Sequence, residues 1–283
     1  MIAQLFPHHA ERVDLPGPYG PIAALRTPAD AEQTVLLVPG YTGSKEDFAP
    51  LLDGIAEAGF RAVAIDLPGQ FESPGPADES AFLPAPLGKV VAMVAELLGA
   101  DGVPVRLLGH SYGGLVARGA VLAGAPVSGL TLLDSGPSEL PDGPRREALG
   151  LGEPLLRNAG VAAAYSVREQ MSARFPAWAQ LPAELKDFYR HRFTSSSPSA
   201  LLGMADGLRY EPDLVASLAE VLATRKLPAL VVAGEGDDAW SVASQRDMAA
   251  RLGARFETVP GAGHSPNTEN PPALLEILIS AWR

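Results

Sequence analysis

A serine lies between glycines in the segment Gly109-His110-Ser111-Tyr112-Gly113, which follows the apolar run VRLL and precedes the small-residue stretch GGLVARGAVLAG. A turn of this kind between a strand and a helix is so tight that the serine adopts strained backbone angles, and side chains at the glycine positions would clash. The turn also places the hydroxyl at a helix N-terminus, where developing negative charge is favoured. This context favours a nucleophile at Ser111 over an ordinary glycine-rich turn.

A serine hydroxyl needs a base within hydrogen-bonding distance, and a histidine fits that role best. His264 ends the strand-like segment FETVPGAGH, and ligand sites of parallel sheets open at the carboxyl ends of their strands. The other histidines lie near the N-terminus, within the serine turn or among charged residues: His8, His9, His110 and His191. The sequence therefore predicts His264 as the base, with a solvated loop histidine as the alternative.

The imidazole in turn needs a carboxylate that fixes its tautomer and stabilises its charged form. Two acids follow strand-like runs, Asp237 after ALVVAG and Asp134 after LTLL. Asp237 gives the chain order serine, acid, histidine, with the acid one strand before the histidine. Asp237 is the preferred candidate and Asp134 the alternative.

The oxyanion of a tetrahedral intermediate needs hydrogen-bond donors aimed at it. The backbone NH of Tyr112, directly after the candidate nucleophile, is one candidate. The NH of Tyr41, in the loop PGYTGS after an early apolar run, is the other. The Tyr41 phenol either adds a third donor or lines the pocket.

Positioning these residues requires strands whose carboxyl ends meet at one edge of a sheet. Six apolar runs end in turn residues and predict strands buried on both faces: residues 34–40, 61–69, 105–114, 130–136, 229–237 and 256–264. Ahead of them, ERVDLPGPYGPIAALRTP alternates polar and apolar residues around a turn, which predicts an antiparallel hairpin at the sheet edge. Together they predict a mostly parallel, eight-stranded sheet.

Stretches with helical spacing of apolar residues separate the runs, as parallel strands require. Ser44, with Asp47 three residues later, predicts a capped helix after the first parallel strand. The same spacing predicts a helix over residues 87–98, and Asn270 before Pro271 predicts the start of a C-terminal helix. The predicted fold class is a doubly wound α/β sheet.

A long stretch between LLDSG and LPALVVAG has helical segments but no strand pattern. We predict that residues 137–208 form an inserted helical lid, that residues 1–136 and 209–283 form the core, and that a core helix returns before residue 227. Aromatic and methionine side chains of the lid either line an apolar pocket or form the lid's own core: Tyr165, Met171, Phe175, Trp178, Phe188, Tyr189, Phe193 and Met204. Four residues are expected to contact the substrate: Gly40, His110, Trp178 and Trp240.

Composition limits the class of protein. The chain has 283 residues, of which 47% are hydrophobic, and no cysteine, which excludes disulfides, thiolate metal sites and cysteine nucleophiles. The net charge of -11 without a basic patch disfavours nucleic acids and anionic membranes, and neither a signal peptide nor an apolar run of about 20 residues is present. We expect a cytoplasmic monomer or homodimer without a metal or cofactor, whose partners are a small ester-like substrate and water.

With these positions assigned, the chain resembles the α/β-hydrolase superfamily over nearly its whole length, in the branch with a helical lid after the sixth strand. The resemblance implies that Ser111 in GHSYG is the nucleophile, Asp237 in GEGD the acid and His264 in GAGHSP the base. It also places the oxyanion loop in PGYTGS.

Two motifs depart from the family pattern. Pro39-Gly40 stands where many members have His-Gly, so a supporting hydrogen bond is expected to be missing while the Tyr41 amide remains. In the turn at residues 66–73, Phe71 occupies the second glycine of D-x-x-G-x-G-x-S, which predicts a bulkier loop. Neither departure affects the three candidate catalytic residues.

A serine nucleophile disfavours epoxide hydrolases and haloalkane dehalogenases, which use an aspartate there. We expect a carboxylesterase-like serine hydrolase that cleaves a small or medium apolar carboxylic ester or lactone through an acyl-enzyme. The same triad supports carbon-carbon bond, thioester or peptide hydrolysis and cofactor-free perhydrolysis, which the motifs do not separate. A ligand receptor without turnover on the same scaffold is a further alternative, which the intact triad disfavours.

Overall fold

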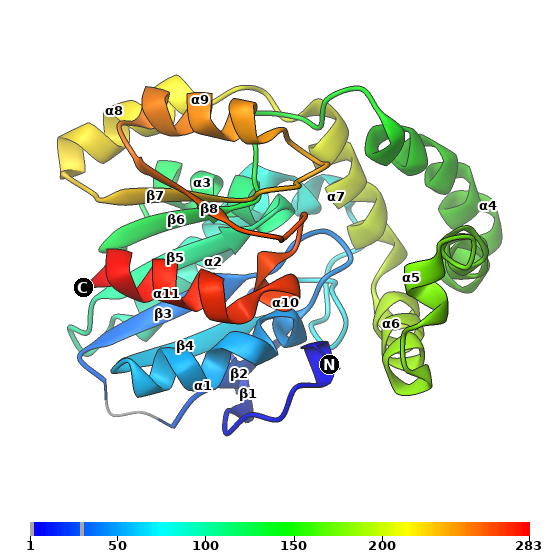
Figure 1. Cartoon of the computed structure of the whole chain (residues 1–283), viewed down its shortest axis with the longest axis horizontal. Coiled ribbons are helices and arrows are strands. Elements are labelled where there is room, and N and C mark those ends of the chain that lie inside the picture. The colour runs from blue at the N-terminus through cyan, green and yellow to red at the C-terminus, as the bar shows by residue number, and fades with distance from the viewer. Residues whose placement is uncertain (1–2, 29–30) are drawn as a thin grey trace.

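An eight-stranded sheet forms the centre of the protein in the computed structural model, which describes residues 3–28 and 31–283 (Figure 1). The strand order is β1-β2-β4-β3-β5-β6-β7-β8, with parallel pairing from β4 to β8 and an antiparallel β1–β2 hairpin at one edge. The predicted fold class and edge hairpin are confirmed. The strands are β1 (Glu11–Leu15), β2 (Ile22–Arg26), β3 (Gln33–Val38), β4 (Phe60–Ile65), β5 (Val105–His110), β6 (Gly129–Leu133), β7 (Ala229–Gly234) and β8 (Arg255–Val259).

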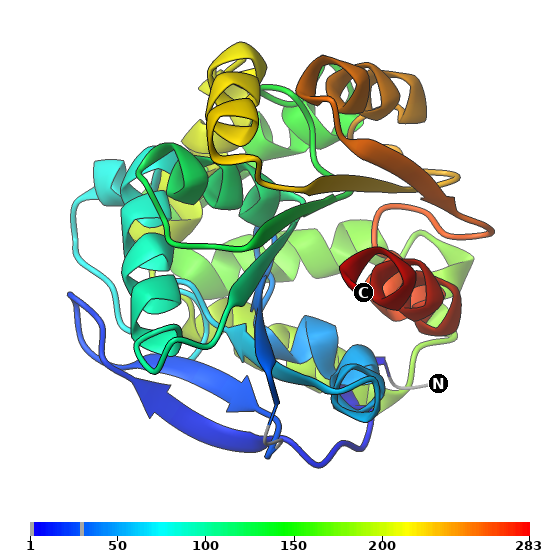
Figure 2. The ribbon, with the colours of Figure 1, turned by 90° about the vertical axis from the view of Figure 1, so that its left-hand side faces the viewer.

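Helices cover both faces of the sheet, which explains the continuous apolar runs. Along β3, Val35 and Leu37 enter one hydrophobic core, whereas Leu36 and Val38 enter the other, because successive side chains of a strand point to opposite faces. Helices α1 and α11 pack on the first face, and α2, α3, α8 and α9 on the second (Figure 2). Their bounds are α1 (Ala49–Glu57), α2 (Pro84–Leu98), α3 (Tyr112–Leu122), α8 (Val215–Arg225), α9 (Val242–Leu252) and α11 (Pro271–Trp282).

The helix expected to start after Ser44 begins differently. A 3-10 turn, η2 (Lys45–Phe48), precedes α1, although the Ser44 amide does donate to the Asp47 carboxylate at 3.2 Å. Pro50 explains the break, because proline is favoured in the first turn of an α-helix but its ring and missing NH prevent the helix from extending backwards through it. Three further short helices are η1 (Ala3–Leu5), η3 (Glu79–Phe82) and α10 (Pro266–Glu269).

Four helices between β6 and α8 lie beyond one end of the sheet (Figure 1): α4 (Pro144–Ser172), α5 (Pro176–Ala179), α6 (Ala183–Ser195) and α7 (Pro198–Tyr210). Helix α4 changes direction at Gly160, which has φ 82°. Helix α7 runs past the predicted boundary at residue 208 and contributes Met204 and Leu208 to the main core. The role of this segment as a lid stays a prediction. Within the described residues, none of the helices combines the length and apolar character needed to cross a membrane.

Arg118 on α3 ties together the two points where the chain leaves the core for α4 and returns from α7. Its guanidinium donates to the Pro137 carbonyl and, at 2.7 Å, to the Glu211 carboxylate. The side chains of Arg118 and Glu211 are only 2% and 10% exposed. Removing one partner of a buried pair leaves the other charge without compensation, which is far more destabilising than replacing both by apolar groups.

Arg118→Met is therefore expected to lower the free energy of unfolding by about 3–5 kcal/mol. The double variant Arg118→Met/Glu211→Leu should be more stable than the single variant, because no buried charge remains unpaired. Urea unfolding followed by circular dichroism measures both. A single variant as stable as the wild type would contradict this role for the ion pair.

Candidate active site

The turn from β5 into α3 has the strained geometry that the sequence predicts. Ser111 has φ 54° and ψ -120°, and α3 begins at the next residue. A Cβ at Gly109 would lie 2.1 Å from the Gly113 carbonyl oxygen, and a Cβ at Gly113 would lie 2.4 Å from that of Val38. No other residue type fits either position without movement of the backbone. The Ser111 hydroxyl thus stands at the N-terminus of α3.

Loops after β5, β7 and β8 bring Ser111, Asp237 and His264 into one hydrogen-bonded chain. The Ser111 hydroxyl lies 2.9 Å from His264 Nε2, and His264 Nδ1 lies 2.7 Å from Asp237 Oδ1. With the hydrogen on Nδ1, the imidazole donates to the carboxylate and its Nε2 accepts from the serine. This arrangement can remove the serine proton during attack on an electrophile.

Three donors hold the Asp237 carboxylate in place. Besides His264, the Ala239 amide donates to Oδ1 at 2.8 Å, and Gln245 Nε2 donates to Oδ2 at 2.7 Å. The carboxylate is fully buried, and burial alone would raise its pKa. The hydrogen bond and charge of His264, together with the Ala239 amide, outweigh burial and lower the pKa of Asp237. Asp237 is therefore ionised at neutral pH.

Asp134, the competing acid, does not bond to the imidazole. It is fully buried with φ 45°, and its Oδ1 accepts from the Gly234 amide at 2.7 Å. Burial first, and then the neighbouring charge of Asp237, raise the pKa of Asp134 well above its usual value. Ligand atoms of Asp134, Asp237 and His264 lie within 4.8 Å of one another, which makes them the one candidate metal cluster of the described chain.

The loop after β3 approaches the nucleophile closely. A Cβ at Gly40 would lie 3.0 Å from Ser111 Cβ, so the loop backbone passes directly beside the serine. Gln70 Nε2 donates to the Gly40 carbonyl at 2.8 Å. Because the carbonyl and NH of a trans peptide point in opposite directions, this bond also sets the direction of the Tyr41 NH. The Tyr112 NH is the first of α3 and has no carbonyl of a preceding turn to bond.

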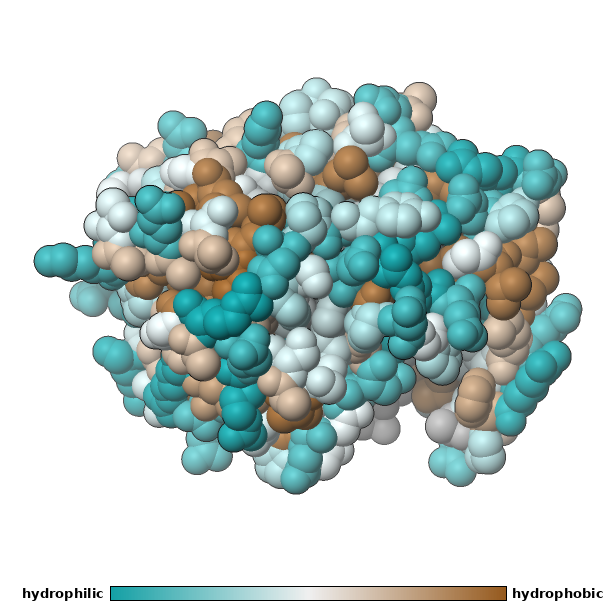
Figure 3. Space-filling view, turned by 90° about the horizontal axis from the view of Figure 1, so that it is seen from above, coloured by the Kyte–Doolittle hydropathy of each residue, from teal (hydrophilic) through white to brown (hydrophobic). Residues whose placement is uncertain are grey.

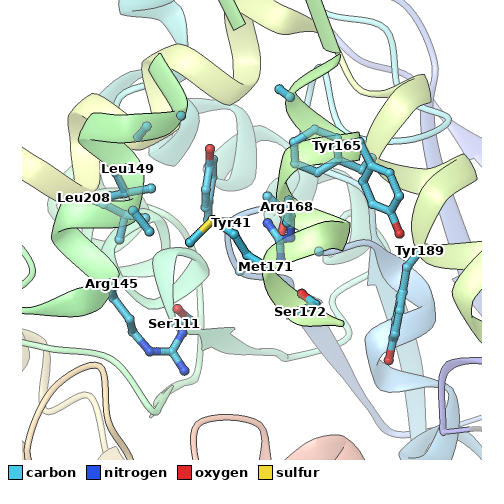
Figure 4. A pocket seen from close by; sticks show the side chains of 18 of the residues that line it. Tyr41, Ser111, Arg145, Leu149, Tyr165, Arg168, Met171, Ser172, Tyr189 and Leu208 are labelled. Atoms are coloured by element: carbon cyan, nitrogen blue, oxygen red, sulfur yellow. The ribbon is translucent and has the colours of Figure 1, made fainter. Parts of the chain in front are cut away.

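The Tyr41 phenol stays neutral and faces the cavity. Burial, opposed by smaller effects of Arg168 and Arg209, raises the pKa of Tyr41 to about 12. Figure 4 shows its hydroxyl directed away from Ser111. The phenol therefore lines the cavity without being directed at the serine.

A cavity of about 580 Å³ opens over Ser111 and His264, and its size suits a small organic ligand (Figure 4). Gly40, His110 and Trp178 line it, as do six of the eight side chains named for the predicted lid: Tyr165, Met171, Phe175, Trp178, Tyr189 and Phe193. Tyr165 and Phe193 also pack in the hydrophobic cluster between α4, α6 and α7, so both predicted roles apply to them. The other two pack elsewhere, Phe188 edge-on against Phe71 and Met204 in the main core.

Trp240 and His110, two of the four residues expected to contact the substrate, make their hydrogen bonds within the protein. Trp240 is outside the cavity lining, because it is 2% exposed, packs near the His264 ring at 6.2 Å between centroids, and donates from Nε1 to the Glu139 carbonyl. That expectation was wrong. His110 reaches the cavity, but its Nε2 donates to the His264 carbonyl at 2.8 Å. Burial, and then the charge of His264, lower the pKa of His110 to about 4, so its ring is neutral.

Sequence reasoning missed several polar residues of the site. Gln70 holds the loop after β3 and Gln245 holds Asp237, while Gln4 lines the cavity and bonds to Asp47 and Tyr189. Arg168 projects from α4 into the same cavity. Only Gln70 had a local signal, because it lies in the unusual turn at residues 66–73.

Comparison with known proteins identifies the family of the chain. Residues 35–277 match the alpha/beta hydrolase family, and the chain belongs to that family. A curated relative, the putative 2-succinyl-6-hydroxy-2,4-cyclohexadiene-1-carboxylate synthase of Bacillus subtilis (strain 168), is 26% identical over 257 residues, which cover 86% of this chain and 87% of the relative.

Solved structures show the same fold. A thermophilic esterase from Thermogutta terrifontis with malate bound superposes with a TM-score of 0.74 at 24% identity, covering 96% of this chain and 97% of the esterase. MenH from S. aureus superposes with a TM-score of 0.70 at 21% identity, covering 91% of this chain and 96% of MenH.

Gln70→Leu is expected to lower kcat by about tenfold to a hundredfold with little change in KM, because a misdirected Tyr41 NH would weaken oxyanion stabilisation. Steady-state kinetics on an activated aryl ester measures this. Gln33→Leu is the matched control, since Gln33 bonds to Arg106 far from the cavity. Unchanged kcat in a folded Gln70→Leu variant would contradict the positioning role.

Proposed function

We propose that this protein is a serine hydrolase that cleaves small or medium carboxylic esters or lactones through an acyl-enzyme on Ser111. The observation that carries the proposal is the hydrogen-bonded chain from Ser111 through His264 to the buried Asp237, which opens into the cavity. Nucleophile, base and orienting acid at these distances are the arrangement that acyl transfer requires.

In the first half of the reaction, His264 Nε2 takes the Ser111 proton as the oxygen attacks the ester carbonyl. The amide hydrogens of Tyr41 and Tyr112 stabilise the resulting oxyanion. Collapse of the intermediate breaks the ester bond, and His264 returns the proton to the leaving alcohol. Water, activated by His264, then releases the acid and restores Ser111.

The cavity supports an organic substrate with apolar parts. Leucine, tyrosine, tryptophan and phenylalanine side chains from α4, α5, α6 and α7 line the side opposite Ser111. Aromatic and aliphatic walls bind by burial of apolar surface and leave orientation to a few polar groups. We propose that residues 137–208 act as a lid that selects the substrate.

A second candidate keeps the same residues but forms no covalent intermediate. The curated relatives carry the name of a synthase rather than a hydrolase. In this reading the His264 and Ser111 pair removes a proton from a carbon of the substrate. Rapid quenching followed by mass spectrometry separates the two, because only ester cleavage leaves an acyl group on Ser111.

Ser111→Ala should lower kcat on aryl esters by several orders of magnitude, about 10⁴-fold or more, because no nucleophile remains. Ser128→Ala is the control, since Ser128 precedes β6 at the opposite end of the sheet. Hydrolysis of 4-nitrophenyl butanoate, followed by release of nitrophenolate, gives both rates. Wild-type turnover by the Ser111→Ala variant would end the proposal.

A further inference from the structure

The cavity contains an arginine whose charge no carboxylate compensates. Three arginines line it, and two of them are paired, Arg145 with Asp238 at 2.5 Å and Arg192 with Asp47 at 2.7 Å. The third, Arg168, has no ion pair or hydrogen bond with any residue in the ranges 3–28 and 31–283. Its positive charge therefore remains for a ligand.

The acids that line the cavity do not cancel this charge, because each is already paired. Asp47 binds Arg192, and the other two bind arginines that do not line the cavity. Those pairs are Glu153 with Arg157 and Arg209, and Glu169 with Arg190. After all pairs are made, the cavity wall keeps a net positive charge at Arg168.

Arg168 is exposed where it lines the cavity, and an aromatic side chain holds its guanidinium in position. The guanidinium carbon lies 5.5 Å from the centroid of the Phe193 ring, a cation-π contact. Arg168 and Tyr41 both project into the cavity, and the neutral Tyr41 phenol supplies a second donor on this wall (Figure 4). Because this exposed guanidinium has no carboxylate partner among the described residues, it can bind an anionic group of a ligand in the cavity.

Apolar side chains surround this charge at the cavity's outer wall. Four that line it are large and exposed, with exposed fractions of 67% for Leu151, 37% for Val167, 43% for Met171 and 67% for Phe175. Figure 3 shows apolar side chains gathered at the end of the molecule where α4 lies. A ligand that matches this wall has an apolar chain and one anionic group.

We propose that the substrate is an apolar ester that carries a carboxylate, such as a monoester of a dicarboxylic acid, and that Arg168 binds this carboxylate while Ser111 attacks the ester. A guanidinium matches a carboxylate with two parallel hydrogen bonds, and the Tyr41 phenol donates a third. The inference rests on the proposed ester hydrolysis and names its substrate class. Arg168 is thus a specificity-determining residue.

Pairs of esters that differ only in the carboxylate test the proposal. Monoethyl glutarate and monoethyl adipate are compared with ethyl pentanoate and ethyl hexanoate, which have the same acyl lengths, by release of acid into an indicator buffer. The wild type should prefer the charged esters in kcat/KM by about ten- to a hundredfold. Arg168→Gln should remove that preference by lowering kcat/KM for the charged esters more than for the neutral esters.

Arg174→Gln is the matched control, because Arg174 follows the end of the same helix but does not line the cavity. Its preference should equal that of the wild type. Equal kcat/KM for charged and neutral esters in the wild type, or an unchanged preference in Arg168→Gln, would overturn the inference while leaving ester hydrolysis intact.

A binding measurement separates failure of this inference from failure of the proposed function. Ser111→Ala is titrated calorimetrically with monoethyl adipate and with ethyl hexanoate, so no turnover is needed. The carboxylate site is supported if Ser111→Ala binds only the charged ester and Ser111→Ala/Arg168→Gln binds it about tenfold or more weakly. This result would stand even if the wild type cleaves neither ester. Equal binding of the two esters overturns it.

Discussion

The hydrogen bond between the Ser111 hydroxyl and His264 Nε2 is the contact on which the site depends. It joins residues 153 positions apart in the chain and exists because β5 and β8 end at the same edge of one parallel sheet. The strained backbone of Ser111 is held by the glycines on either side, whose positions admit no side chain. Loss of sheet register or of those glycines would therefore remove the contact without changing either reacting residue.

Two neighbouring carboxyl groups show how burial separates chemical roles. Asp237 accepts three hydrogen bonds, has a lowered pKa and stays ionised, whereas burial and the charge of Asp237 raise the pKa of Asp134 well above its usual value. Only the ionised group can stabilise the charged imidazole formed during attack. Among the arginines that line the cavity, Arg145 and Arg192 are paired with carboxylates, whereas Arg168 has no carboxylate partner in the described part of the chain; we propose that it binds the substrate.

Strand-end residues could be predicted from the sequence because their surroundings are local. Ser111, Asp237 and His264 each follow an apolar run, so all three were expected at the carboxyl ends of strands in one parallel sheet. Gln70 and Arg168 could not be assigned roles, because these depend on partners far away in the chain: the Gly40 carbonyl lies 30 positions from Gln70. The Trp240 prediction failed because it was based on sequence position alone. Trp240 lies close to Asp237 in the sequence, which suggested a place in the cavity, yet the Trp240 indole packs against the Gly136 backbone in the core.

Covalent labelling tests the activation of Ser111 most directly. A fluorophosphonate reacts only with a serine whose proton a neighbouring base removes, and mass spectrometry then identifies the modified residue. We expect a single adduct on Ser111 in the wild type and labelling slower by at least about a hundredfold in His264→Ala. A folded wild-type protein that resists the reagent, or a His264→Ala variant that reacts equally fast, would contradict this activation.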